Sequence, residues 1–370
     1  MGLEFWRVGQ LRPRTIASEA AELERAGWDG ILMGDNQCLV GDCYVGLAVA
    51  AQATSTIKLG VGVTNPVTRH PSVTAAAAAG LHDLSNGRMV LGIGRGDSAL
   101  AHVGVAPSGL RAFESYVRNV QTYLRGEGVP LTQLDRAGQR LSAALAGAGV
   151  PDDSRLRWID PRRPKVPVDV AASGPAVIGI AARLADQVTF GVGADPARLA
   201  WAIDAARTAR SDAGLDPSTL RMGAYVNVVA HPDEGVAREL AASGVATFSR
   251  FSIMHGKTSG PVSDQARTVL ENISRSYDLR EHASGDAKHG AAVDADYIAS
   301  FGIAGTPAQC ADRLVSLGQL GLDRVVILGG LAPSTAGAQE KLRVSREVLA
   351  AEVFPAVRRR LAGQANGLSR

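Results

Sequence analysis

Three carboxylates stand where the sequence could support acid–base chemistry. Glu4 lies in the first apolar run of the chain, Asp35 follows the second run, and Asp97 follows the fourth. If the three share one concave, partly dry site, mutual repulsion favours a protonated form of at least one, which can then donate or relay a proton. The alternative is structural: Glu4 pairs with a core arginine, and the aspartates cap the helices that follow them.

Glycine-containing turns suggest sites for a planar or anionic ligand. The turn at residues 94–97 (GRGD) lets backbone amides approach a ligand closely, because glycine has no Cβ. Ser173 and Gly174 precede a predicted helix, so a hydroxyl and free amides would face a phosphate there. The loop around Gly193 offers further amides at another helix start. Ordinary turn chemistry is the alternative for all three loops.

Other catalytic signatures do not occur in the sequence. The seven histidines are dispersed without HExxH or paired Cys/His spacing, so no metal site is expected. There is no GxSxG motif of a serine hydrolase and no GxxxxGK[ST] phosphate loop. The strand-end carboxylates therefore remain the best candidates for chemistry.

Alternating elements would bring these residues together. Short apolar runs alternate with Ala-rich helical patterns, which is typical of βα units and a parallel sheet. Strands are predicted at residues 3–7, 30–33, 57–63, 89–93, 168–171, 187–190, 222–229 and 324–328. Helices are predicted at residues 13–26, 44–53, 72–84, 110–124, 176–185, 196–211, 233–242, 306–320 and from near 334.

This order predicts an α/β fold, a (β/α)8 TIM barrel whose chemistry lies at the carboxyl ends of the strands. A doubly wound sheet would need a phosphate loop after the first strand, and residues 8–12 (VGQLR) do not form one. Two irregular segments, at about 126–165 and 243–305, lengthen the chain beyond the roughly 250 residues of a typical barrel. We interpret residues 1–370 as one barrel domain with these segments as insertions. Candidates for substrate contact within them are Trp158, Arg162, Arg163, Phe251, His255, Tyr277 and Tyr297.

Composition excludes several functional classes. Of the 370 residues, 46% are hydrophobic and 20% are charged, which argues against a disordered or membrane-spanning chain. The net charge of +3 is spread without a basic block, so no nucleic-acid partner is expected. Cys38, Cys43 and Cys310 form no CxxC pair, and the first residues lack the apolar run of a signal peptide. We therefore expect a cytoplasmic protein acting on a small molecule.

Several stretches resemble the bacterial-luciferase-like oxidoreductases. They are residues 58–71 (KLGVGVTNPVTRHP), 84–97 (LSNGRMVLGIGRGD), 170–175 (VAASGP) and 305–328. Within that family the chain is similar to the branch of methylenetetrahydromethanopterin reductase, which uses the deazaflavin coenzyme F420. The resemblance implies a barrel with insertions, commonly a homodimer, that binds the cofactor ring at the carboxyl ends of the strands.

The resemblance also implies roles for individual residues. A cis peptide bond is expected between Gly62 and Val63, in a bulge that supports the back of the ring. Gly96 and Asp97 are expected near the pyrimidine or reactive edge of the ring. The complete set of implied cofactor-binding residues is Asp35, Gly62, Val63, Thr64, Asn65, Gly96, Asp97, Ser173, Gly174 and Gly193.

The working hypothesis is hydride transfer between reduced F420 and an imine, a C=C bond or a pterin-like carbon. Asp97, Glu4 or Asp35 would supply or relay the proton. Alcohol- and sugar-phosphate-oxidising relatives carry a histidine after the second-strand acid, whereas this chain has Asn36, which argues against alcohol oxidation. Two alternatives remain open: an FMN-dependent monooxygenase of the same family and a non-catalytic flavin-binding protein.

Overall fold

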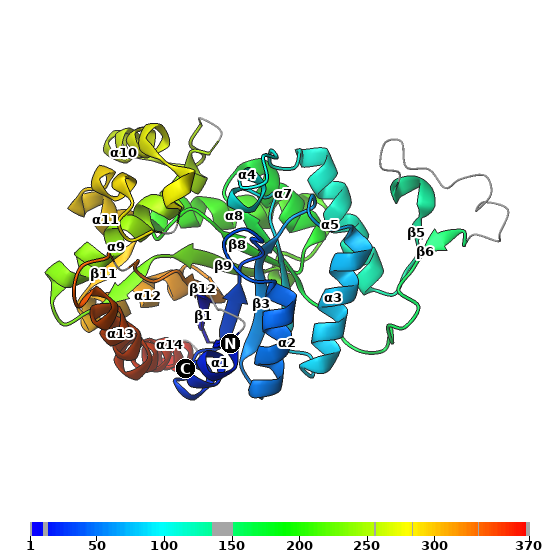
Figure 1. Cartoon of the computed structure of the whole chain (residues 1–370), viewed down its shortest axis with the longest axis horizontal. Helices are drawn as coiled ribbons and strands as arrows, with labels where there is room; N and C mark the ends of the chain where they lie inside the picture. The colour runs from blue at the N-terminus through cyan, green and yellow to red at the C-terminus, as the bar shows by residue number, and fades with distance from the viewer. Residues whose placement is uncertain are drawn as a thin grey trace.

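Eight parallel strands close into a barrel in this computed structural model, which describes residues 2–9, 14–134, 151–254, 257–282, 284–331 and 333–367 (Figure 1). Each strand pairs with its neighbours in chain order, and the last pairs with the first, so that Phe5 lies opposite Val325. The barrel strands are β1 (Glu4–Gly9), β2 (Gly30–Met33), β3 (Lys58–Thr64), β4 (Met89–Ile93), β7 (Val168–Ala172), β8 (Gln187–Phe190), β9 (Arg221–Val226) and β12 (Arg324–Ile327). The predicted TIM barrel is confirmed.

Helices surround the barrel, and local signals explain where they begin. Asp42 caps one by accepting hydrogen bonds from the backbone of Tyr44 and Val45, and Thr306 forms a capping box with Gln309. The larger helices are α1 (Ile16–Arg25), α2 (Cys43–Ala53), α3 (Pro71–Leu84), α5 (Leu110–Leu124), α7 (Pro175–Leu184), α8 (Pro196–Asp212), α9 (Glu234–Ser249), α12 (Pro307–Gln319), α13 (Ala338–Val348) and α14 (Phe354–Gly367). In the described ranges, no helix combines the length and apolar character needed to cross a bilayer.

Strand β3 is irregular where it passes β4. The register shifts between Val61 and Thr64, and the Gly62–Val63 peptide bond is cis, as the resemblance implied. Glycine on the β4 side makes room for this irregularity, because a Cβ on Gly92 would overlap the Val61 carbonyl oxygen. The bulge therefore depends on glycine in the neighbouring strand.

The barrel interior has an apolar layer above a charged floor. Trp6, Leu32, Val90 and Val326 form the apolar layer. At the amino ends of the strands, Arg324 contacts Asp169 at 2.8 Å, and both side chains are less than 5% exposed. The larger apolar core lies between the strands and the surrounding helices.

The two irregular segments differ in structure. Residues 135–150 of the first expected insertion lie outside the described residues. Its flanks form the hairpin of β5 (Val129–Pro130) and β6 (Asp153–Ser154), which lies beyond α3 and α5 in Figure 1. The second segment contains part of α9, η3 (Arg250–Ser252), α10 (Asp264–Ser276), η4 (Leu279–Glu281), η5 (Lys288–Ala292), α11 (Ala295–Phe301) and β11 (Ile303–Gly305). We call residues 249–302 the covering segment, because they contact loops at the carboxyl ends of the strands.

The prediction of one strand over residues 222–229 is wrong. The chain leaves the barrel after Val226, and β10 (Val228–Ala230) pairs instead with β11. The backbone carbonyl of Asn227 accepts a hydrogen bond of 2.8 Å from Ile303, a residue far along the chain. Helix α9 also continues to Ser249, beyond its predicted end at residue 242.

Candidate active site

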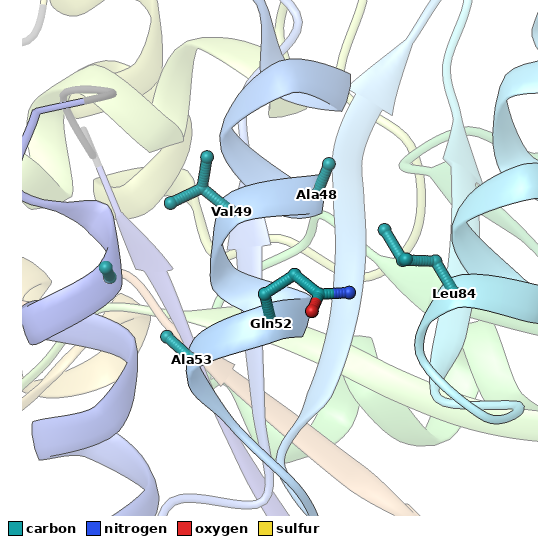
Figure 2. Close-up of a pocket in the computed structure, with 6 residues that line it drawn as sticks. Ala48, Val49, Gln52, Ala53 and Leu84 are labelled. Atoms are coloured by element: carbon teal, nitrogen blue, oxygen red, sulfur yellow. The ribbon is translucent and has the colours of Figure 1, made fainter.

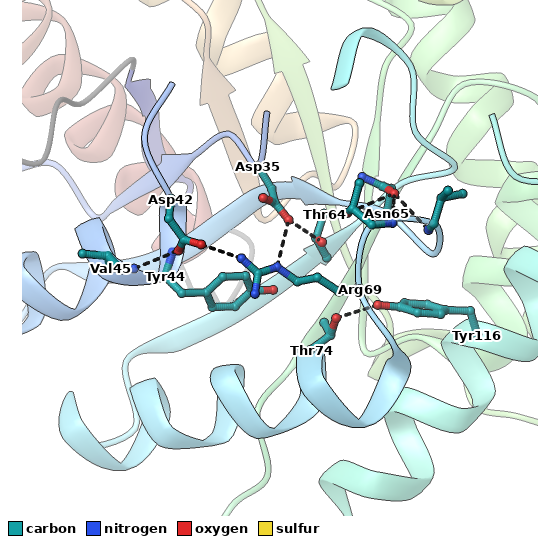
Figure 3. A network of polar contacts seen from close by, with 11 residues as sticks. Asp35, Asp42, Tyr44, Val45, Thr64, Asn65, Arg69, Thr74 and Tyr116 are labelled. Atoms are coloured by element: carbon teal, nitrogen blue, oxygen red, sulfur yellow. Dashed lines mark hydrogen bonds and ion pairs between the residues drawn. The ribbon is translucent and has the colours of Figure 1, made fainter. Parts of the chain in front are cut away.

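Asp35 lies in a polar network at the rim formed by the carboxyl ends of the strands, called here the C-terminal rim (Figure 3). Asp35 is 9% exposed, and its Oδ2 atom accepts a hydrogen bond of 2.7 Å from Thr64 Oγ1. Arg69 lies between Asp35 and Asp42, at 3.8 and 2.6 Å, and its guanidinium stacks 4.5 Å over the Tyr44 ring. Burial opposes the charge of Arg69, but the two carboxylates outweigh burial and raise its pKa. Asp35 is thus oriented by a neighbouring strand and an adjacent cation.

Asn65, directly after β3, presents an unpaired donor at this rim. Its Oδ1 atom accepts hydrogen bonds from the backbone nitrogens of Val67 and Thr68, at 3.0 and 3.1 Å, so the amide orientation is fixed. Its Nδ2 atom is buried and has no hydrogen-bond partner among the described residues. A buried unpaired donor is costly, so it marks a position where a ligand acceptor would be stabilising.

Asp97 lies at the same rim, after β4, and is bound by Arg250 of the covering segment. Gly96 precedes it with a φ of +89°, and a Cβ there would overlap Leu100 Cδ1, so glycine is required. Both carboxylate oxygens of Asp97 accept hydrogen bonds from Arg250, one from Nη1 and one from Nη2 at 2.7 Å. Asp97 precedes helix α4 (Ser98–Ala101), but its side chain makes no capping hydrogen bond to that helix in the described chain.

Aromatic and imidazole rings of the covering segment lie behind Arg250. The guanidinium lies 4.7 Å over the Tyr277 ring, which stacks on His289 at 4.5 Å. The Tyr277 hydroxyl is hydrogen-bonded to His282 Nδ1. Burial raises the pKa of Tyr277 to about 12 and lowers the pKa of His282 to about 4. Near neutral pH both side chains of this pair are uncharged.

Glu4 does not share this rim, and the prediction that three carboxylates meet there is wrong. Glu4 opens β1, so it lies at the amino ends of the strands. Its Oε1 atom contacts Lys58 at 2.7 Å and Arg221 at 2.8 Å, and Trp6 donates to Oε2 at 2.9 Å. Burial alone would raise the pKa of Glu4, but these hydrogen bonds lower it to about 2. Glu4 is a charged member of the barrel floor and no part of the acid–base site.

The expected phosphate-binding residues lie at the starts of two helices. Gly174 is the N-cap of α7 and, within the described residues, has no side-chain cap. A Cβ on Gly174 would lie 3.6 Å from Ser259 Oγ of the covering segment, and Ser173 is partly exposed beside it. Gly193 has a φ of +80°, and a Cβ there would lie 2.7 Å from the Phe301 ring. Gly193 is therefore also needed for packing against α11.

Arg198 connects the covering segment to the loop after β8. Its side chain is buried, and it donates hydrogen bonds of 3.1 Å to the Val192 carbonyl and to Ser252 Oγ, and one of 3.2 Å to the Ser259 carbonyl. The covering segment thus contacts the C-terminal rim near three strands. Arg250 binds Asp97 after β4, Ser259 lies beside Gly174 after β7, and Ser252 and Ser259 accept hydrogen bonds from Arg198 after β8.

Sequence reasoning missed Arg69 and Arg250, the cations that bind the two rim aspartates. Arg69 follows the same strand end as Asn65, so its loop position was a usable signal. Arg250 is 153 residues from Asp97 in the chain and had none. Among the proposed substrate contacts, Tyr277 lies beside Arg250, whereas Trp158 is 57% exposed on the first insertion. His255 lies outside the described residues.

An apolar groove of about 510 Å³ lies elsewhere, on the outside of the barrel (Figure 2). It runs between α1, α2 and α3, away from both aspartates. Its lining residues are Ala17, Ala48, Val49, Gln52, Ala53 and Leu84. Since this groove contains no titratable side chain, we assign the chemistry to the C-terminal rim. In the described residues, no group of three or more His, Cys, Asp or Glu side chains could hold a metal ion.

Comparisons with known proteins match nearly the whole chain. The model of the family described as luciferase-like monooxygenase matches residues 5–324. A 5,10-methylenetetrahydromethanopterin reductase of Methanolobus tindarius is 26% identical, covering 86% of this chain and 91% of the relative. A phthiodiolone/phenolphthiodiolone dimycocerosates ketoreductase of Mycobacterium bovis is 28% identical, covering 75% of this chain and 70% of the relative. The solved coenzyme F420-dependent tetrahydromethanopterin reductase of Methanopyrus kandleri superposes with a TM-score of 0.70 at 24% identity, covering 96% of this chain and 99% of that chain.

Proposed function

Because the chain belongs to the luciferase-like monooxygenase family, we propose that it is an oxidoreductase that transfers a hydride between reduced F420 and a small organic substrate. The observation that carries this proposal is the match of 86% of the chain to a methylenetetrahydromethanopterin reductase. The geometry of the C-terminal rim supports it, since Asp35 and Asp97 lie at the ends of β2 and β4 and both are paired with arginine.

The residues at the rim fit the ring of such a cofactor. The unpaired Asn65 Nδ2 atom is a donor for a ring carbonyl, and the bulge in β3 lies directly before it. Gly96 keeps the backbone open at the next strand end. We assign ring binding to Asp35, Gly62, Val63, Thr64, Asn65, Gly96 and Asp97, and phosphate binding to Ser173, Gly174 and Gly193.

The chain's own residues bind the cofactor, orient Asp35 and exclude water from the rim. When bound, F420 supplies the hydride. Thr64 and Arg69 orient Asp35 through its Oδ2 atom, and we assign proton transfer to and from the substrate to Oδ1. The covering segment shields the rim near β4, β7 and β8, which strengthens electrostatic interactions there. Asn36, which donates a hydrogen bond of 3.1 Å to Ser98, stands where the resemblance would place the histidine of alcohol-oxidising relatives, and we therefore propose an imine, C=C or pterin-like substrate.

A cofactor titration followed by an oxygen measurement tests the function. We expect tight binding of F420, weaker binding of FMN, and oxidation of reduced F420 by 5,10-methylenetetrahydromethanopterin or by an imine or alkene probe without oxygen uptake. Tight FMN binding with oxygen consumption would contradict the proposal in favour of a monooxygenase. Tight binding without turnover of any imine, alkene or ketone probe would favour a non-catalytic flavin-binding protein.

We further infer a homodimer that pairs through the face of α2 and α3. Helix α2 contains no charged side chain, and Val45, Val49, Val73 and Leu84 on these two helices are 38% to 57% exposed. A two-fold axis would place this face against its own copy and bury the apolar groove of Figure 2. The three cysteines are free thiols, which supports action in the cytoplasm.

A further inference from the structure

We propose that Arg250 is a positioning residue for Asp97, which it holds as a hydrogen-bond acceptor toward the bound ring or substrate. The inference rests on the proposed function in one respect: it takes Asp97 to face the cofactor. It gives the covering segment a role in the active site, because the sequence predicted no contact between this segment and Asp97.

In the described chain, the Asp97 carboxylate does not cap the helix that follows it. Asp42 and Asp195 also precede helices, and their side chains accept hydrogen bonds from the first helical turn. Asp97 precedes α4 with a φ of −146° and a ψ of −99°, and in the described chain its carboxylate makes no such bond. The carboxylate points instead to Arg250, a residue of another element.

Arg250 is itself fixed on both sides. Asp97 binds one edge of the guanidinium through two hydrogen bonds, and the Tyr277 ring covers one face at 4.7 Å. Tyr277 in turn stacks on His289, which is fully buried and contacts Thr247 Oγ1 at 3.2 Å. The guanidinium is therefore anchored to α9 through packed side chains. The two charged side chains are only 17% and 13% exposed, so neither is readily solvated without the other.

The paired carboxylate of Asp97 can accept hydrogen bonds from a ligand but cannot donate one. Both oxygens accept from Arg250, so in this arrangement the carboxylate has no proton to give. Each oxygen has a second lone pair, which can accept an N–H or O–H of a ligand. Only arginine supplies two parallel donors in a plane, so lysine would retain the charge but lose the geometry.

A double-mutant cycle on F420 affinity tests the proposal. The variants are Arg250→Met, Arg250→Lys, Asp97→Asn and Arg250→Met/Asp97→Asn. Arg238→Met is the control, because Arg238 lies on α9 in an exposed pair with Glu234. We expect Arg250→Met and Asp97→Asn each to weaken F420 binding about tenfold and the double variant no further. Arg250→Lys should recover part of the loss, and the control should match the parent protein.

The possible outcomes separate this proposal from the proposed function. Additive losses, or an unchanged dissociation constant for Arg250→Met in a parent that binds F420, would overturn the role of Arg250 alone. A parent protein that binds neither F420 nor FMN would overturn the proposed function. In that case the urea midpoint still decides whether Arg250 holds Asp97. Arg250→Met must lower the midpoint more when Asp97 is present than in the Asp97→Asn variant, where only the packing on Tyr277 is lost, and equal shifts in both would refute the pairing.

Discussion

At the scale of single residues, the three predicted carboxylates differ in the side chains that surround them. Asp35 accepts from Thr64 and faces Arg69, Asp97 accepts twice from Arg250, and Glu4 lies among cations at the other end of the barrel. Only the first has an oxygen that we assign to proton transfer. Residue type was therefore a weaker guide to chemistry than the partner of each side chain.

Asp35→Asn should reduce hydride transfer by about 10²–10⁴-fold, because general acid–base groups contribute that much. The amide keeps the shape of the side chain, so the dissociation constant for F420 should change less than the rate. Single-turnover oxidation of reduced F420 measures the rate. Asp83→Asn is the matched control, since Asp83 is 67% exposed and pairs with Arg163. An unchanged rate in Asp35→Asn would remove Asp35 from the mechanism.

Glu4→Gln should destabilise the protein by about 1.5–3 kcal/mol, because hydrogen bonds from charged donors are lost in a half-buried site. The folded pKa of Glu4, about 2, lies below its ordinary value of 4.5. Its contribution to stability is therefore complete above pH 4.5 and is lost as the pH falls toward 2.

Urea unfolding of the parent and Glu4→Gln at pH 7 and pH 3 measures this contribution. The gap between the two proteins should narrow at pH 3, and F420 affinity at pH 7 should be equal in both. A gap of constant size would show that the carboxylate charge does not contribute.

At the scale of elements, helices and strands that are bounded by turn residues were predictable from sequence. The bounds of β2, β4, α5 and β8 are confirmed, because turn residues and a switch of hydrophobic period delimit each of them. Glu4 was misplaced because it is the first residue of β1, which ends at Gly9, so its side chain lies at the amino ends of the strands although it falls within the predicted strand 3–7. The split after Val226 and the Arg250–Asp97 contact depend on partners far along the chain, which no local pattern encodes.

Gly92→Ala should disrupt the bulge of β3 and cost at least about 2 kcal/mol, because its Cβ would overlap the Val61 carbonyl oxygen. F420 affinity should fall with it. Gly363→Ala, at an exposed position of α14 with nothing within 4 Å, should instead stabilise by about 0.5–1 kcal/mol. Thermal unfolding of both variants measures the contrast. Equal midpoints would show that the strand tolerates a side chain there.

At the scale of the whole molecule, the inferred dimer makes a prediction about mass. The parent should elute with light scattering at twice 38.4 kDa. Val49→Glu should dissociate it, because a charge would be buried in an apolar interface. Leu215→Glu is the control, since Leu215 is 39% exposed and Val49 is 38% exposed, but Leu215 lies away from α2 and α3. A parent of single-chain mass, or a Val49→Glu variant of unchanged mass, would contradict the pairing face.

The position of Trp6 gives the barrel a built-in optical reporter. The indole is 1% exposed, lies under the Arg324 guanidinium at 4.9 Å and donates to Glu4. Trp28, 5% exposed, adds to the buried emission, whereas Trp158 is 57% exposed on the first insertion. Buried indoles fluoresce at shorter wavelengths than exposed indoles. Emission at the blue edge of the spectrum therefore reports whether the barrel is folded, and emission at the red edge, which iodide quenches selectively, reports on the exposed segment of Trp158. In a Trp201→Phe background, which removes the half-buried fourth indole on α8, the barrel and the segment after β6 can therefore be followed separately in one unlabelled sample.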